Sequence, residues 1–160
     1  MTAWALITLA VATVGPDTDH WLTGGSMPAL PVTTLAGETT PPPWKGAETV
    51  VVLWAGWCGP CVAELPVLAD AMNTVGDAAR PVTLLSIDEQ PKVARKALQR
   101  AVRKPPAWTP VWGGPEAGGR LGVRTVPAAF VVKADGTIQS VWTGYQGKAA
   151  WTAILTADAP

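Results

Sequence analysis

Cys58 and Cys61 are the only cysteines in the 160-residue chain, and Gly59 and Pro60 lie between them. A Cys-x-x-Cys pair can cycle between a dithiol and a disulfide, because the two thiols are close enough to bond. A structural zinc site needs about four Cys or His ligands, and the chain adds only His20 to the two cysteines. A disulfide scaffold would contain more cysteines at wider spacings. We therefore expect a redox pair, with no metal and no cofactor other than its own disulfide.

The sequence around the pair predicts that it lies at the start of a helix. Residues 50–54 form a continuous apolar and largely β-branched run, which is typical of a strand buried on both faces. Gly59-Pro60 then opens a helical pattern, where proline is well tolerated. Unpaired N–H groups and the helix dipole stabilise a thiolate at such a position, and the thiolate is the nucleophile of disulfide exchange. Cys58 is thus the expected attacking residue, and Cys61, one turn further on, the resolving residue.

The remaining patterns predict a mixed α/β sandwich. The strand–helix–strand–helix order, followed by strand–strand–helix, predicts one sheet of mixed strand directions with helices above and below it. The expected elements are a short edge strand within 30–35, a helix from 59 to 75 kinked at Pro66, a strand at 82–87, a basic helix at 91–102 with Val93, Ala97, Leu98 and Ala101 facing inward, a short strand at 109–112, a brief helix at 115–121, a hairpin of 128–133 and 137–142, and a last helix at 148–155.

Composition and charge favour one folded domain, and we expect a monomer. Hydrophobic residues make up 48% of the chain and charged residues 15%, which is typical of a globular protein. The twelve basic residues are balanced by twelve acidic ones, so we expect neither nucleic acid nor an anionic membrane surface as the main partner. Basic residues do cluster between Lys92 and Lys104. Such a run is usually a solvated helix face and less often a docking surface for an acidic partner.

The N-terminus is apolar and precedes the expected domain. We assign residues 1–24 to an apolar segment with a linker, and residues 25–160 to the domain. Residues 3–14 contain only Thr8 and Thr13 as polar interruptions, and the run is shorter than the ~20 residues that span a bilayer. It resembles the core of a secretory signal with Ala10-Val11-Ala12 as a cleavage site, although no basic residue precedes it. We expect an extracytoplasmic location, periplasmic or secreted. The alternative is a cytoplasmic protein whose N-terminal segment is buried or disordered.

The segment Trp57-Cys58-Gly59-Pro60-Cys61 resembles the thioredoxin active-site motif, and the chain as a whole resembles the TlpA/ResA-like thiol–disulfide oxidoreductases. The resemblance spans roughly residues 25–158. It implies a thioredoxin-like three-layer sandwich, with a central mixed β-sheet flanked by helices on both faces. The supporting segments, in chain order, are Pro28-Ala29-Leu30-Pro31, Leu35-Ala36-Gly37, Cys61-Val62-Ala63-Glu64-Leu65-Pro66, Ser86-Ile87-Asp88, Gly122-Val123-Arg124-Thr125-Val126-Pro127 and Asp135-Gly136.

The resemblance also implies roles for residues around the pair. Pro127 would form a cis peptide bond and face the cysteines. The peptide group before it, contributed by Val126, would hydrogen-bond to the substrate backbone. Independently of the resemblance, Trp57 is the neighbour of the expected nucleophile and would shield or orient the site, and Gly59 and Pro60 between the cysteines would keep the turn tight.

Glu64 lies one turn beyond Cys61, and two interpretations of it stay open. As an acid in the first turn of the helix it would only interact favourably with the helix dipole. As a carboxylate beside Cys61 it would shuttle the proton of that thiol or bias its ionisation. Thioredoxin uses a buried aspartate on the preceding strand for this task, and the matching position here is Val52. Because valine cannot accept a proton, the apolar Val52 favours Glu64 as the residue that takes over the role of the thioredoxin aspartate.

We expect a reductase of protein disulfides that receives electrons from an upstream donor, for which a membrane thiol reductase is a candidate. The resemblance adds two roles: cytochrome c maturation, with apocytochrome c cysteines as clients, and extracytoplasmic redox homeostasis. One alternative is a thiol peroxidase of the peroxiredoxin-related type, but residues 54–57 lack the threonine that such enzymes place before the reactive cysteine. The other is a redox-inert binding module that presents the Trp-, Pro- and Gly-rich loop at residues 105–119.

Overall fold

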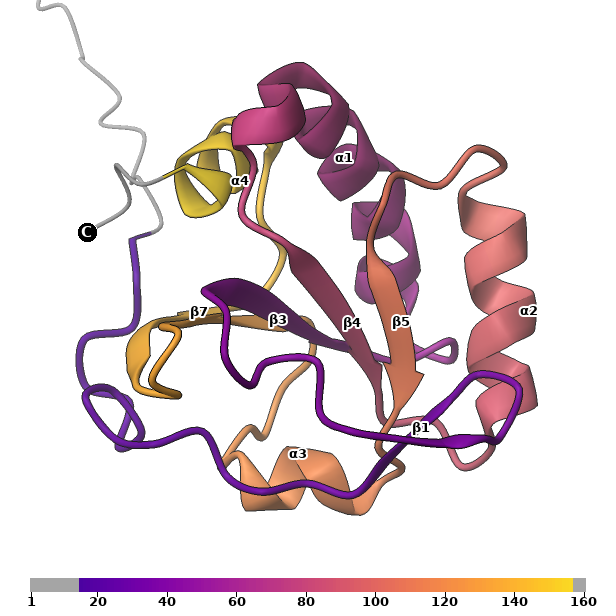
Figure 1. Cartoon of the computed structure of the whole chain (residues 1–160). Helices are drawn as coiled ribbons and strands as arrows, with labels where there is room; N and C mark the ends of the chain where they lie inside the picture. Colours follow the sequence, from indigo (N-terminus) through magenta and orange to yellow (C-terminus); the bar gives the residue numbers. More distant parts are fainter. Residues whose placement is uncertain (1–14, 157–160) are drawn as a thin grey trace, which may run out of the picture.

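The computed structural model describes residues 15–156, so the apolar segment and its candidate cleavage site lie outside the described residues. A seven-stranded sheet in the order β2-β1-β5-β4-β3-β6-β7 forms the middle of the molecule (Figure 1). The strands are β1 (Val32–Thr34), β2 (Thr39–Thr40), β3 (Thr49–Trp54), β4 (Val82–Ser86), β5 (Thr109–Trp112), β6 (Ala128–Val132) and β7 (Ile138–Thr143). The helices are α1 (Gly59–Val75), α2 (Pro91–Ala101), α3 (Glu116–Arg120) and α4 (Lys148–Leu155), with a short 3-10 turn, η1, at Gly76–Ala78.

Strand β3 lies inside the sheet and leads directly to the cysteine pair. It pairs in parallel with β4 and antiparallel with β6, and all six of its residues are buried. β4 in turn pairs in parallel with β5. Parallel neighbours require crossover connections, which α1 and α2 provide. The carboxyl ends of β3 and β4 therefore meet at one edge of the sheet, where α1 and α2 begin.

Two apolar cores lie on opposite faces of the sheet. One packs α1, α2 and α4 against side chains such as Val52 and Leu84. The other packs α3 and residues 22–44 against side chains such as Leu53 and Phe130. Successive strand residues face opposite sides of a sheet, and the alternation of Val52 and Leu53 between the two cores follows from this. The expected three-layer sandwich is confirmed, with one short helix and an extended segment covering the second face.

Most predicted elements are present within two residues of their expected bounds. The strand expected at the sheet edge is not the edge strand, because the short strand β2 pairs with the outer side of β1. One detail of α2 is also wrong. We expected Val93 on the inner face of that helix, but its side chain is 39% exposed. The buried residues are Ala94, Ala97 and Leu98. The helix is rotated by about one position from the expected face because Ala94, and not Val93, lies one turn before the Ala97–Leu98 pair.

Residues just before position 25 lie against β7. The backbone N–H of Asp17 donates to the carbonyl of Val141 at 2.6 Å, and that of Gly24 donates to Ile138 at 2.9 Å. The domain boundary after residue 24 stays a prediction. Within residues 15–156, the helices are too short or too polar to cross a lipid bilayer.

Candidate active site

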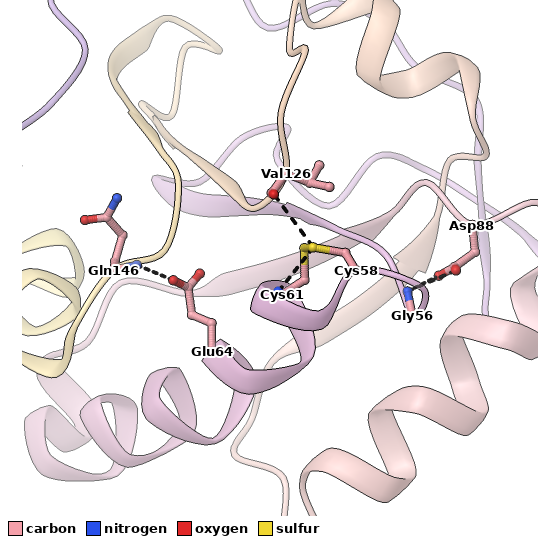
Figure 2. The surroundings of a disulfide bond; sticks show 7 residues. All are labelled: Gly56, Cys58, Cys61, Glu64, Asp88, Val126 and Gln146. Atoms are coloured by element: carbon pink, nitrogen blue, oxygen red, sulfur yellow. Dashed lines mark hydrogen bonds between the residues drawn. A yellow bond between two sulfur atoms is a disulfide. The ribbon is translucent and has the colours of Figure 1, made fainter.

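Cys58 occupies the N-terminal cap of α1, as the sequence predicts. Its backbone is extended, and the backbone N–H of Cys61 donates to its Sγ at 3.2 Å (Figure 2). Pro60 stands in the first helical turn, where the absent N–H leaves no hydrogen bond unmade. An N–H group aimed at Sγ and the positive end of the helix dipole both stabilise negative charge on that sulfur. The local structure therefore suits Cys58 to act as a thiolate.

Cys58 and Cys61 form a disulfide, with their Cα atoms 5.2 Å apart. Cys58 is 6% exposed and Cys61 1% exposed. The neighbouring Trp57, in contrast, is 63% exposed. Cys58 is therefore the more accessible of the two cysteines, and Cys61 is almost completely covered by protein.

The peptide bond between Val126 and Pro127 is cis, which confirms the expectation. This segment precedes β6 and crosses in front of the cysteine pair. The carbonyl oxygen of Val126 lies 3.7 Å from Cys58 Sγ (Figure 2). Pro127 is buried and Val126 is half-buried. Residues 68 positions apart in the sequence are thus adjacent at the reactive sulfur.

Glu64 is buried in the second turn of α1, so the interpretation of Glu64 as an acid in the first turn of the helix is wrong. The backbone N–H of Gln146, in the loop before α4, donates to its carboxylate (Figure 2). The pKa of Glu64 is raised to about 7, because burial raises it by more than the hydrogen bond from Gln146 lowers it. The indole N–H of Trp151 also lowers the pKa, although its geometry falls short of a full hydrogen bond. Val52, where thioredoxin has an aspartate, lies in the apolar core that contains both cysteines.

Asp88 belongs to a segment that carries the family resemblance, but sequence reasoning gave it no role at this site. It follows β4, is fully buried, and accepts the backbone N–H of Gly56 with both carboxylate oxygens at 2.9 Å. The hydroxyl of Ser86 donates to it at 2.8 Å. Asp88 therefore fixes the turn two residues before Cys58. The feature of the sequence that could have indicated this role is an acidic residue at the carboxyl end of the strand next to β3.

The other candidate residues have mainly structural surroundings. Trp108 is buried, and the indole N–H of Trp112 donates to the Asp88 carbonyl at 2.6 Å. His20, the one histidine of the chain, is half-buried, and its ring packs edge-on against Phe130 with the ring centroids 5.9 Å apart. Residues 15–156 contain no group of three or more His, Cys, Asp or Glu side chains that could hold a metal ion.

The fold and the cysteine pair together define a thioredoxin-like thiol–disulfide oxidoreductase, and the comparisons with known proteins agree. The AhpC/TSA family model matches residues 24–141, so the chain belongs to that family. A thioredoxin of Listeria monocytogenes is 27% identical over 95 residues, which cover 59% of this chain and 67% of the relative.

Solved structures show the same fold. A thiol:disulfide interchange protein of Chlorobium tepidum, named as a DsbE, superposes with a TM-score of 0.67 at 21% identity, over 82% of this chain and 92% of its own. A secreted disulfide oxidoreductase of Mycobacterium tuberculosis gives 0.63 at 20% identity, over 78% of this chain and 92% of its own. At these identities the likeness establishes the fold.

Proposed function

We propose that the protein reduces disulfide bonds in other proteins through the Cys58–Cys61 pair. In the reduced enzyme, the Cys58 thiolate attacks one sulfur of the client disulfide, and the other client sulfur leaves as a thiolate. Cys61 then loses its proton and attacks Cys58 Sγ, which releases the second client sulfur. The client gains two electrons from the two enzyme sulfurs and two protons, one that Cys61 releases and one from water, which took up the Cys58 proton when the thiolate formed. The enzyme keeps the Cys58–Cys61 disulfide. The observation that carries this proposal is Cys58 Sγ at the N-terminus of α1, accepting the Cys61 N–H at 3.2 Å.

Glu64 is the proposed acceptor of the Cys61 proton. A base works best when its pKa is close to the working pH, and burial brings the pKa of Glu64 to about 7. The carboxylate projects from α1 one turn beyond Cys61. With the apolar Val52 at the alternative position, Glu64 is the carboxylate on the helix that is best placed for this step.

Val126 and Trp57 are the proposed client-binding residues. The Val126 carbonyl lies beside the reactive sulfur, where a client backbone placed for exchange would pass within hydrogen-bonding reach. Pro127 fixes the direction of that segment. Trp57 offers an exposed ring next to Cys58 for apolar contact with the client. Gly59 and Pro60 shape the turn between the cysteines.

We further propose that the protein acts as a reductase, outside the cytoplasm, on particular client proteins. The Gly-Pro dipeptide resembles that of reducing thioredoxins, and the apolar residues 3–14 support export. A monomer outside the cytoplasm, reduced by an upstream donor such as a membrane thiol reductase, would fit both features. Apocytochrome c is the client that the TlpA/ResA resemblance suggests.

Insulin reduction with dithiothreitol as electron source tests the reaction. We expect clear catalysis by the wild type, and for Cys58→Ser only the rate of dithiothreitol alone. Activity unchanged in Cys58→Ser would refute the role of the pair.

A redox titration tests the direction of the reaction, because a reduction potential near about −120 mV, as in strong oxidants, would contradict a reductase. Trapping with Cys61→Ser identifies clients, since Cys58 stays bonded to them. An alkaline phosphatase fusion to residues 1–30 that stays inactive would contradict export.

A further inference from the structure

The positive charge of this neutral protein is concentrated in one element. The segment from Lys92 to Lys104, which is α2 and the start of the following loop, contains six of the twelve basic residues and none of the twelve acidic ones. The rest of the chain therefore has twice as many acidic as basic residues. Clustered charge of one sign produces a local potential that can attract a partner of opposite sign, even when the net charge is zero.

These six side chains are exposed and form no ion pair with an acidic side chain of residues 15–156. We call them the basic face of α2: Lys92, Arg95, Lys96, Arg100, Arg103 and Lys104. The ion pairs within residues 15–156 join Arg80 to Glu48 and Lys148 to Asp70, and neither involves this face. The opposite side of the helix is anchored in the core by Ala94, Ala97 and Leu98. The helix is therefore rigidly held while its charges point to solvent.

A hollow adjoins the basic face at the carboxyl end of α2. We call it the α2 groove; its volume is about 310 Å³, and it is lined by Leu98, Gln99, Val102, Arg103, Pro105, Pro106, Trp108 and Pro110. A second, shallower hollow of about 230 Å³ is lined by Lys96, Gln99 and Arg100. Gln99 lies between the two. Apolar walls stiffened by proline beside cationic side chains suit a segment that carries both an apolar and an acidic side chain.

The amino end of α2 packs against the turn that precedes the reactive cysteine. A Cβ added to Gly56 would meet Ala97 Cβ at 2.9 Å and the Val93 carbonyl at 3.3 Å. Asp88, at the entry to α2, holds the Gly56 N–H (Figure 2). At about 1.5 Å per residue, the far end of the helix at Ala101 lies about 12 Å from Val93. A chain lying along α2 would therefore extend from the groove to the redox site.

We propose that the basic face of α2 and the α2 groove form a docking surface for an acidic segment of a redox partner protein. This inference rests on the proposed function, because docking there would present the partner's sulfurs to Cys58. A protein segment fits better than a bilayer. The α2 groove is concave, and Val93 is the one large apolar side chain of α2 that is exposed, so α2 lacks the protruding apolar residues that insert into lipid.

Charged peptide substrates provide the test. Three synthetic peptides of equal length, each with one internal disulfide, carry flanking segments rich in Glu, Lys or Ser. We expect the reduced protein to reduce the Glu-rich peptide at least about tenfold faster than the Lys-rich one at low ionic strength, since electrostatic steering changes association rates by about 10–1,000-fold. The difference should shrink as salt is added.

Matched variants separate the basic face from net charge. Lys96→Glu/Arg100→Glu should lose most of the preference for the Glu-rich peptide. Lys45→Glu/Lys133→Glu makes the same change in net charge at exposed positions elsewhere and should keep the preference. Gln99→Glu, which adds one negative charge between the two hollows, should lower the Glu-rich rate severalfold. The Ser-rich peptide, whose flanking segments carry no charge, provides the reference rate within each variant.

Several outcomes would overturn the docking surface. Equal rates for the Glu-rich and Lys-rich peptides would do so, as would an equal loss of preference in the Lys45→Glu/Lys133→Glu control. Tighter binding of phosphatidylglycerol vesicles by the wild type than by Lys96→Glu/Arg100→Glu, without any peptide preference, would assign the face to a membrane instead. Fluorescence anisotropy with a cysteine-free Glu-rich peptide and the oxidised protein tests docking by itself. A protein that binds this peptide through α2 but reduces no disulfide would refute the proposed function and keep the surface.

Discussion

Glu64→Gln removes a negative charge from a buried side chain and leaves an oxygen that can still accept the Gln146 N–H. Burial raises the pKa of Glu64 from 4.5 to about 7. The folded protein therefore binds this proton more tightly than the unfolded chain does, and its stability falls as pH rises between the two values. The stabilisation is complete below pH 4.5 and is lost as the pH passes through 7.

The size of the effect follows from the shift. One pKa unit corresponds to about 1.4 kcal/mol, so the shift sets a ceiling of about 3 kcal/mol. Partial relaxation and water entry around the charged carboxylate reduce the expected effect to about 2 kcal/mol. Between pH 5 and pH 8, wild-type stability should therefore fall by about 2 kcal/mol more than that of Glu64→Gln.

Urea denaturation of the oxidised proteins at several pH values measures this difference. Other titrating groups are common to both proteins, so their contributions cancel in the comparison. Glu116→Gln makes the same chemical change at an exposed position and should follow the wild type at every pH. A difference between wild type and Glu64→Gln that stays constant from pH 5 to pH 8 would refute the argument that burial raises this pKa.

Three further substitutions test other parts of the structure. Gly56→Ala should cost about 1–3 kcal/mol, because its Cβ would meet Ala97 Cβ at 2.9 Å; chemical denaturation that shows no loss would contradict this close approach. Arg80→Met should cost about 2 kcal/mol, since buried Arg80 pairs with Glu48 and donates to two carbonyls at the end of α4; an unchanged denaturation midpoint would count against that role. Trp57→Ala should change stability by less than about 0.5 kcal/mol, because the ring is 63% exposed, yet slow insulin reduction severalfold; an unaltered rate would remove Trp57 from the client-binding surface.

Local patterns were sufficient to predict the elements that position the cysteines. The apolar run of β3 and the Gly-Pro start of α1 each contain their signal within a few residues, so both were placed correctly. Pro66 lies within α1, and the helix continues through it to Val75. The family resemblance supplied the cis bond before Pro127, which no local pattern could have indicated, because prolines of either isomer occur before strands.

Contacts between distant segments account for what the sequence could not predict. The burial of Glu64 depends on a loop 82 residues further along the chain, and the role of Asp88 depends on Gly56, 32 residues before it. Contacts between residues so far apart in the sequence produce no periodic pattern from which they could be predicted. The position of Val93 shows a related limit: a pattern of apolar residues indicates an amphipathic helix, but alanines on the buried side leave its rotation uncertain by one residue.

The burial of Cys61 beneath Cys58 also determines how long the enzyme stays attached to anything it attacks. In the proposed mechanism, the second sulfur is held within the protein beside every bond that Cys58 forms. Well-oriented groups within one molecule react as if present at about 10⁵ M or more, far above the millimolar thiols of any medium. A small thiol such as glutathione, once joined to Cys58, would be expelled by Cys61 before a second small thiol arrives. The lifetime of each adduct is then a property of the protein and not of its surroundings.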